Sequence, residues 1–266
     1  MPPTNVLLRL KYEKWAEEYL KSLPLEHFME ATAQSRQREI TVESFALIRA
    51  KRPEFHYFNE LLIQYPRKGR VVPGRVVPDN MVVLHHGEIK ATGSYDLPFQ
   101  PGGPFWTLEY VSKSNERKDY DTNLRIYERH LQVPFYMAFY PDLQDLSLFR
   151  LQAGKYVLVL PNASGRYPID TIDVEVAILE GWVRYWYLGK LLPLPAELDR
   201  DLIAARAQLL KAQKRADDER KRAEDERKRA DDEKKRADDF QRQNEEMARR
   251  IAELEARAAG NGKKKK

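Results

Sequence analysis

The 266-residue sequence contains no cysteine, which excludes disulfide bonds and zinc sites built on thiolates. Because disulfides are absent from most proteins of reducing compartments, we predict a cytoplasmic protein. No apolar run approaches the roughly 18 residues that a membrane span needs, so we predict no membrane association. The N-terminus also lacks the basic start and apolar stretch of a signal peptide. Neither a GxxxxGK loop nor a GxSxG turn occurs, which argues against P-loop nucleotide hydrolysis and serine hydrolase chemistry.

The net charge is close to zero over most of the chain. Residues 1–200 contain 25 basic and 25 acidic side chains and residues 201–260 contain 17 and 16, so the four terminal lysines supply most of the formal charge of +5. This balance excludes the broad basic surface of a protein that coats nucleic acid. One local basic cluster remains, and we predict that it binds phosphate. Its members are Arg67, Lys68, Arg70 and Arg75.

Proline is absent after residue 195, and this break in composition divides the chain. The prolines at 193 and 195 predict an extended linker. The predicted organisation is a helical N-terminal segment over 1–24, a domain over 25–192, a linker over 193–200, a charged helix over 201–260 and a basic tail over 261–266.

The charged C-terminal segment repeats every seven residues as RADDERK, RAEDERK, RADDEKK and RADDFQR. One heptad position holds alanine in these repeats, and the position three residues later holds Glu219, Glu226 and Glu233, where a stable coiled coil has leucine or isoleucine. Apolar seam residues are confined to 202–212 and 240–258. We therefore expect a solvated single helix or a weak coiled coil, which leaves a homodimer open, with disorder as the alternative.

Apolar periodicity in the first 192 residues predicts an α/β (α+β) domain, with a sheet flanked by helices. Helices are predicted near 11–22, 42–51 and 115–132. Strands are predicted near 55–64, 76–84, 105–111, 133–140, 147–151, 156–160, 173–179 and 183–188. Turn residues at 93–96 and 101–104 predict a surface excursion between the second and third strands.

Two carboxylates lie in predicted strands that are rich in valine, tyrosine and tryptophan, where charged residues are uncommon. Asp79 interrupts the run 75–84, and Glu109 lies within 105–111. Buried carboxylates are seldom found unless they are paired or bound to metal, so two acids on successive strands indicate a shared divalent cation. Such an ion activates water and stabilises charge on a phosphate. The pattern therefore favours a metal-dependent phosphodiesterase, provided that both carboxylates lie on one face of the sheet.

The motifs around these acids are VVPDNMVV at 76–83, LEYVSKS at 108–114, KDY at 118–120, Tyr127, VPFY at 133–136 and YPD at 140–142. Through these motifs, residues 25–190 resemble the Uma-two family, bacterial proteins expected to be endonucleases with the restriction-endonuclease-like, PD-(D/E)XK fold. The resemblance implies a restriction-endonuclease-like core with a central mixed sheet. It also implies that Asp79 and Glu109 bind Mg²⁺ or Mn²⁺ and that DNA is the substrate.

One position departs from the wider PD-(D/E)XK pattern, because Val111 stands where a lysine usually follows the glutamate, although the Uma-two family commonly has an apolar residue there. Lys113 has the same strand parity, and we rank it first as the residue that polarises the attacking water, ahead of Lys118. Ordinary solvated charge at a helix start is the competing interpretation for both lysines.

A further acid often completes such sites. Glu39 and Glu43 from the second predicted helix and Glu60 from the first predicted strand are candidates, and no motif separates them from surface carboxylates.

Three functions remain open on the sequence. The first is a Mg²⁺- or Mn²⁺-dependent DNA endonuclease with Asp79, Glu109 and Lys113 as its catalytic residues. The second is an inactive nuclease-fold binding module, in which Val111 reflects the loss of chemistry. The third is an assembly protein that acts through its C-terminal helix.

Overall fold

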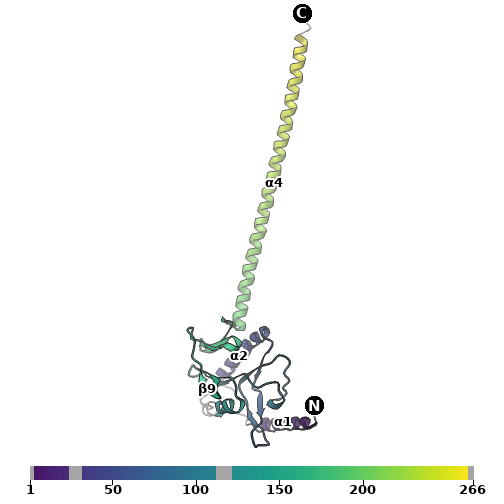
Figure 1. Cartoon of the computed structure of the whole chain (residues 1–266). Coiled ribbons are helices and arrows are strands. Elements are labelled where there is room, and N and C mark those ends of the chain that lie inside the picture. The colour runs from purple at the N-terminus through teal and green to yellow at the C-terminus, as the bar shows by residue number, and fades with distance from the viewer. Residues whose placement is uncertain (1–2, 24–31, 112–121, 263–266) are drawn as a thin grey trace. The chain divides into compact units, whose positions relative to one another are not determined.

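The computed structural model describes residues 3–23, 32–111 and 122–262 (Figure 1). The chain divides into two compact units, Met1–Glu197 and Leu198–Lys266. The first unit is an α/β body, and the second is formed by one helix. In the part of the chain that the structure describes, no helix combines the length and apolarity needed to span a membrane.

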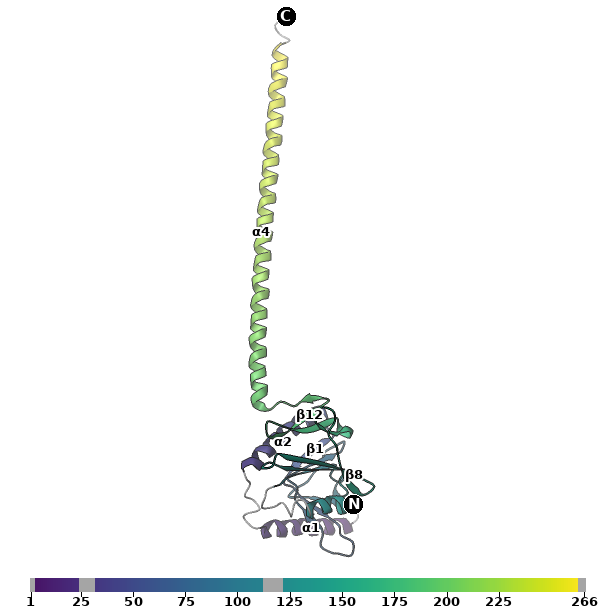
Figure 2. The same ribbon diagram turned by 90° about the vertical axis from the view of Figure 1, so that its left-hand side faces the viewer.

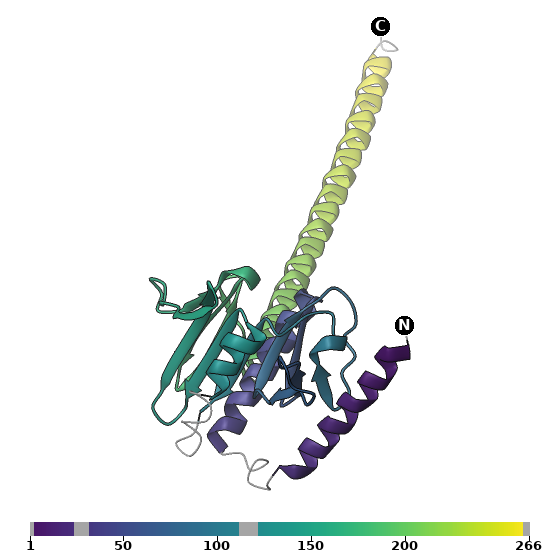
Figure 3. The same cartoon turned by 60° about the horizontal axis from the view of Figure 1, so that its bottom comes forward.

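A six-stranded sheet forms the centre of the body (Figure 3). Its strands are, in spatial order, β1 (Phe55–Asn59), β4 (Asn80–Leu84), β6 (Trp106–Tyr110), β7 (Phe135–Tyr140), β8 (Asp145–Gln152) and β9 (Lys155–Leu158). β6 and β7 are parallel and every other neighbouring pair is antiparallel, so the predicted mixed central sheet is confirmed.

Two smaller sheets flank this centre. One contains β10 (Tyr167–Ile169), β11 (Val174–Leu179), β12 (Trp182–Tyr187) and β13 (Lys190–Leu191), and the other contains β3 (Gly74–Val76), β2 (Leu62–Tyr65) and β5 (Ser94–Asp96). Helix α2 (Thr32–Lys51) lies between β12 and β1 (Figure 2). Its Phe45 packs against Trp106 of the central sheet and Tyr185 of the four-stranded sheet, which joins the two sheets in one core.

The other face of the central sheet carries a second apolar cluster, which includes Met81, Val111, Tyr127 and Tyr136. A short helical segment covers it, formed by α3 (Leu124–Ile126) and the π-helical turn η4 (Tyr127–Leu131). Helix α1 (Pro3–Ser22) contacts β2 and β5 on the same body. The two clusters place the ends of β4 and β6 between packed layers on both faces.

Several predicted elements differ from the observed ones for identifiable reasons. The strand predicted over 55–64 is broken at Glu60, whose φ is 48°. The strand predicted over 76–84 is interrupted at Pro78, which has no N–H to donate to a ladder. The surface excursion predicted at 93–96 is wrong, because Ser94–Asp96 is the buried strand β5, parallel to β2.

Helix α4 (Pro195–Gly262) is a single helix of 68 residues, so the predicted charged helix is confirmed and its alternative, disorder, is not. The helix begins within the stretch 193–200 that the sequence predicts to be an extended linker. Proline is well tolerated in the first turn of a helix, where its missing N–H would have no partner. All described side chains from Leu198 to Ala256 are exposed.

Candidate metal centre

Asp79 and Glu109 lie at the same end of the β4–β6 strand pair. The antiparallel register joins Asn80 to Leu108 and Met81 to Thr107, so Asp79 directly precedes one paired residue and Glu109 directly follows its partner. The strand pair therefore brings the two acids to one end of the sheet, and that their carboxylates face one another stays a prediction.

Three strands are tied together at this point by side-chain and backbone hydrogen bonds. The Tyr110 hydroxyl donates to Asn80 Oδ1 at 2.5 Å, and Asn80 Nδ2 donates to Asn59 Oδ1 at 2.6 Å. On the backbone, Glu60 N–H donates to the carbonyl of Asp79 at 3.1 Å. These contacts hold the end of β1 and the start of β4 against β6, so Asp79 occupies a fixed position.

The Asp79 carboxylate has two directional partners. Its Oδ2 accepts the backbone N–H of Tyr110 at 2.6 Å, and its Oδ1 accepts from Arg38 Nη2 at 3.1 Å. Arg38 projects from α2 and also contacts Glu60 Oε1 through Nη1 at 2.9 Å. One guanidinium thus bridges two carboxylates, which matches the fork geometry of arginine.

Burial raises the pKa of Asp79 above its usual value. The Tyr110 N–H and the charge of Arg38 act in the opposite direction, and the negative charge of Glu60 adds to the increase. Removal from water therefore outweighs the partners of this carboxylate in setting its pKa.

Glu109 is almost fully enclosed, with 3% of its surface exposed. Its Oε1 accepts from the Tyr127 hydroxyl at 2.6 Å and from Asn123 Nδ2 at 3.0 Å. Burial and then the charge of Glu109 hold the pKa of Tyr127 well above 10, so this hydroxyl remains a donor. The charge of Asp79 also raises the pKa of Tyr127, which places both carboxylates within electrostatic range of one hydroxyl.

The donor set suits a hard divalent cation. Mg²⁺ prefers oxygen ligands and is usually bound by one or two carboxylates, with water or substrate oxygens completing its coordination. Within residues 3–23, 32–111 and 122–262, no three His, Asp or Glu side chains gather closely enough to hold a metal. The residues present therefore fit an ion held by Asp79 and Glu109 together with non-protein oxygens.

The candidate third acids occupy different places. Glu60 is connected to Asp79 through Arg38. Glu39 pairs with Arg36, and the pKa of Glu43 is raised by burial and by the nearby Glu39 charge, so these two belong to another part of α2. Glu60 is the candidate that the fold brings to the pair.

The predicted assisting lysines, Lys113 and Lys118, lie outside the described residues. Val111 is 2% exposed and belongs to the apolar cluster of Tyr127, so the usual lysine position is part of the core. Among the described residues, Arg38 brings a positive charge to Asp79.

Sequence reasoning missed Arg38, Asn123 and Tyr127 as partners of the two acids. A single arginine on an amphipathic helix has no distinguishing local pattern. Asn123 and Tyr127, by contrast, are four residues apart and face the same way on a helix. That spacing could have identified a polar pair directed at the sheet, but Tyr127 fits an apolar stripe equally well.

The predicted phosphate-binding cluster divides into two parts. Arg67, Lys68 and Arg70 are exposed in the turn between β2 and β3. Arg75 instead lies 5.0 Å from the centre of the Tyr19 ring and donates to the carbonyl of Trp15 at 3.1 Å. The contacts of Arg75 attach α1 to the body, which leaves the first three as the available cations of this turn.

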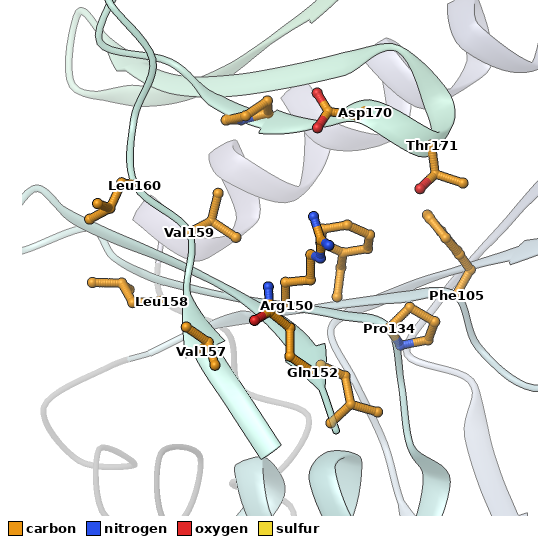
Figure 4. Close-up of a pocket in the computed structure, with 13 residues that line it drawn as sticks. Phe105, Pro134, Arg150, Gln152, Val157, Leu158, Val159, Leu160, Asp170 and Thr171 are labelled. Carbon is orange, nitrogen blue, oxygen red and sulfur yellow. The ribbon is translucent and has the colours of Figure 1, made fainter. Parts of the chain in front are cut away.

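A separate cavity of about 570 Å³ opens between β8–β9 and β10 (Figure 4). Its lining includes Phe105, Arg150, Leu158 and Asp170 and contains neither Asp79 nor Glu109. The candidate metal centre is therefore not part of this cavity.

A known protein family matches most of the body. The Uma2 family, described as "Putative restriction endonuclease", matches residues 28–178. The chain belongs to this family. The Uma2 match includes both carboxylates, Arg38 and the segment that carries Asn123 and Tyr127, and it ends before α4.

One solved structure similar to this Uma2 chain is a putative nuclease belonging to DUF820 from Anabaena variabilis ATCC 29413. It is 17% identical, with a TM-score of 0.41 over 54% of this chain and 75% of that chain. No curated protein matches the sequence.

Proposed function

We propose that the body is a cytoplasmic, Mg²⁺- or Mn²⁺-dependent endonuclease that hydrolyses phosphodiester bonds in DNA. The observation that carries this proposal is the pair Asp79 and Glu109, a half-buried and a buried carboxylate at the same end of the β4–β6 strand pair. Membership of a family described as "Putative restriction endonuclease" supports the reaction class.

Asp79 and Glu109 would hold the cation through their carboxylate oxygens. When bound, such an ion activates water and stabilises charge on the phosphate. Tyr127 and Asn123 orient Glu109, because both donate hydrogen bonds to its Oε1. Glu60 is the favoured third acid because Arg38 joins it to Asp79, and Glu43 is the weaker alternative.

Arg38 remains positively charged at all physiological pH values, so it cannot act as a base. It lowers the pKa of Asp79 and thereby favours the ionised form that binds metal. Its guanidinium is also suited to contact a phosphate oxygen. Lys113 remains our candidate for the residue that assists the attacking water.

A binding module without catalysis is the second candidate, and the buried Val111 is the observation that favours it. The two functions differ in a direct assay. Purified full-length protein is expected to nick or cut plasmid DNA with Mg²⁺ or Mn²⁺ and to be inactive with EDTA. Activity that persists in EDTA would contradict the proposed metal dependence, and DNA binding without cleavage under every metal condition would favour the binding module.

The exposed turn Arg67, Lys68 and Arg70 is expected to bind DNA phosphates. Replacing all three with alanine should weaken DNA binding and reduce the slope of log Kd against log salt by about 1 for each phosphate that is no longer neutralised. The control replaces Lys11, Lys14 and Lys21 on α1, which removes the same charge from another exposed surface of the body. Equal slopes in the two triple variants would show that the charges of the turn contribute no more to DNA binding than other surface charges.

A further inference from the structure

The long helix α4 exposes an apolar seam that nothing in its own unit covers within residues 198–256. Its six large seam residues are each between 49% and 65% exposed. Position a of the heptad contains Leu202, Leu209, Ala216, Ala223, Ala230, Ala237, Asn244 and Ile251, and position d contains Ala205, Ala212, Glu219, Glu226, Glu233, Phe240, Met247 and Leu254. The seam side chains are thus large near both ends and small in the middle, where three glutamates interrupt the apolar positions.

A parallel, in-register pairing of two copies fits this pattern poorly. Each residue would face its own equivalent, so Glu219, Glu226 and Glu233 would form three consecutive layers of opposed carboxylates. Phe240 would face Phe240, whereas Ala216 would face Ala216. Layers of such different thickness cannot keep two helices at a constant separation.

An antiparallel pairing removes these conflicts in one register. When Leu202 lies opposite Leu254 of the second copy, every following layer pairs residues whose numbers have the same sum. The layers are Leu202 with Leu254, Ala205 with Ile251, Leu209 with Met247, Ala212 with Asn244, Ala216 with Phe240, Glu219 with Ala237, Ala223 with Glu233, and Glu226 with Ala230. Every seam glutamate then faces an alanine, and the largest side chain faces one of the smallest.

In this register the seam glutamates also lie near basic residues, and no second glutamate in the same layer competes for these cations. Arginine and lysine occupy the positions on both sides of the seam, as in Arg220, Arg222, Arg227 and Arg229. In the antiparallel register each glutamate lies among these cations without a second glutamate in its layer. This arrangement reduces the cost of placing a carboxylate in the seam.

Asn244 is the one residue that favours the parallel arrangement. A single asparagine at position a can specify a parallel dimer by pairing with its equivalent, and in the antiparallel register it faces Ala212 instead. The absence of one asparagine pair is outweighed by the removal of three layers of opposed glutamates. The self-complementary pattern therefore selects the antiparallel orientation.

We propose that α4 forms an antiparallel coiled coil with α4 of a second copy of this chain, in the register that pairs Leu202 with Leu254. The seam spans 52 residue steps, which corresponds to about 80 Å at 1.5 Å per residue. The two bodies are consequently attached at opposite ends of one coil. The partner is the same chain because its two end segments complement each other layer by layer.

The absence of cysteine makes a direct test possible in the full-length protein. We would prepare Leu209→Cys and Met247→Cys as single variants, one of them with a size tag, mix them under reducing conditions and then oxidise them in a glutathione buffer. The antiparallel register brings these two positions into one layer, within reach of a disulfide. Lys221→Cys and Lys235→Cys are the matched control pair, because they lie at the same height but on the outer faces of the helices.

The expected result is a tagged heterodimer from the Leu209→Cys and Met247→Cys mixture, at least tenfold above the lysine control. Each single variant alone should give little dimer, and Leu209→Cys with Leu254→Cys, one heptad out of register, should give less than the main pair. Efficient dimers from Leu209→Cys alone would establish a parallel coil and overturn the proposal. Monomer in sedimentation, with cross-linking at the control level, would overturn it in favour of a solitary helix.

Discussion

Asp79→Asn and Glu109→Gln are each expected to lose about 10³-fold or more of nuclease activity near neutral pH while keeping the fold of the body. Both substitutions preserve size and remove a negative charge from the pair that would hold the cation. Isothermal titration with Mn²⁺ should show that metal binding is lost together with the activity. Glu175→Gln is the matched control, because its carboxylate pairs with Arg166 at 3.1 Å in the four-stranded sheet and should leave both measurements unchanged.

Asp79→Asn should also stabilise the metal-free body at neutral pH. Burial raises the pKa of Asp79 in the folded state, so folding favours its protonated form. The contribution of Asp79 to stability is therefore fully present below its usual pKa and is lost as pH rises through the raised one. Asparagine does not ionise, so its advantage in free energy of unfolding should grow over that interval and then remain constant.

Tryptophan fluorescence can follow this unfolding selectively, because Trp15, Trp106, Trp182 and Trp186 all lie in the body. A variant that loses both activity and stability would point to a structural role for Asp79. Retained activity in either carboxylate variant, or lost activity in Glu175→Gln, would contradict the assignment of the site.

The central strands and the two acids were predictable because both leave local evidence. Apolar runs rich in aromatic residues place 105–111 and 133–140 in strands, and a carboxylate inside such a run is conspicuous. The pairing of β4 with β6, which brings Asp79 and Glu109 to one end of the sheet, depends on packing between separate segments. The candidate acids themselves are encoded over a few neighbouring residues.

The parts that sequence reasoning missed depend on contacts between distant segments. Asp96 was assigned to a surface turn, yet it accepts hydrogen bonds from Gln64 at 2.9 Å and Ser94 at 2.7 Å inside β5. Turn-forming residues predict exposure only on average, and a polar residue can be buried when a distant partner satisfies it. Likewise, Arg38 reaches Asp79 across 41 positions of sequence, so no short motif includes both.

Arg38→Met is expected to reduce activity by about 10²-fold, comparable to the loss of a residue that orients a metal ligand. The guanidinium holds Asp79 Oδ1 at 3.1 Å and lowers the pKa of this half-buried carboxyl. Without it the pKa of Asp79 rises further, and deprotonation requires a higher pH. The rising limb of the activity–pH profile should therefore move to higher pH, and so should the pH at which Mn²⁺ begins to bind.

This shift distinguishes a positioning role from a purely structural one, because poorer packing would lower activity and stability without moving the limb. Arg38→Lys should return the rising limb of the profile toward its original pH, because the positive charge is restored. It should recover activity only in part, because an ammonium cannot bridge Asp79 and Glu60 as a planar guanidinium does. Arg36→Met, two residues earlier on α2 and paired with Glu39, is the control and should leave the profile in place. An unshifted limb in Arg38→Met would mean that Arg38 does not set the protonation of Asp79, and its contact with the carboxylate would then serve the fold alone.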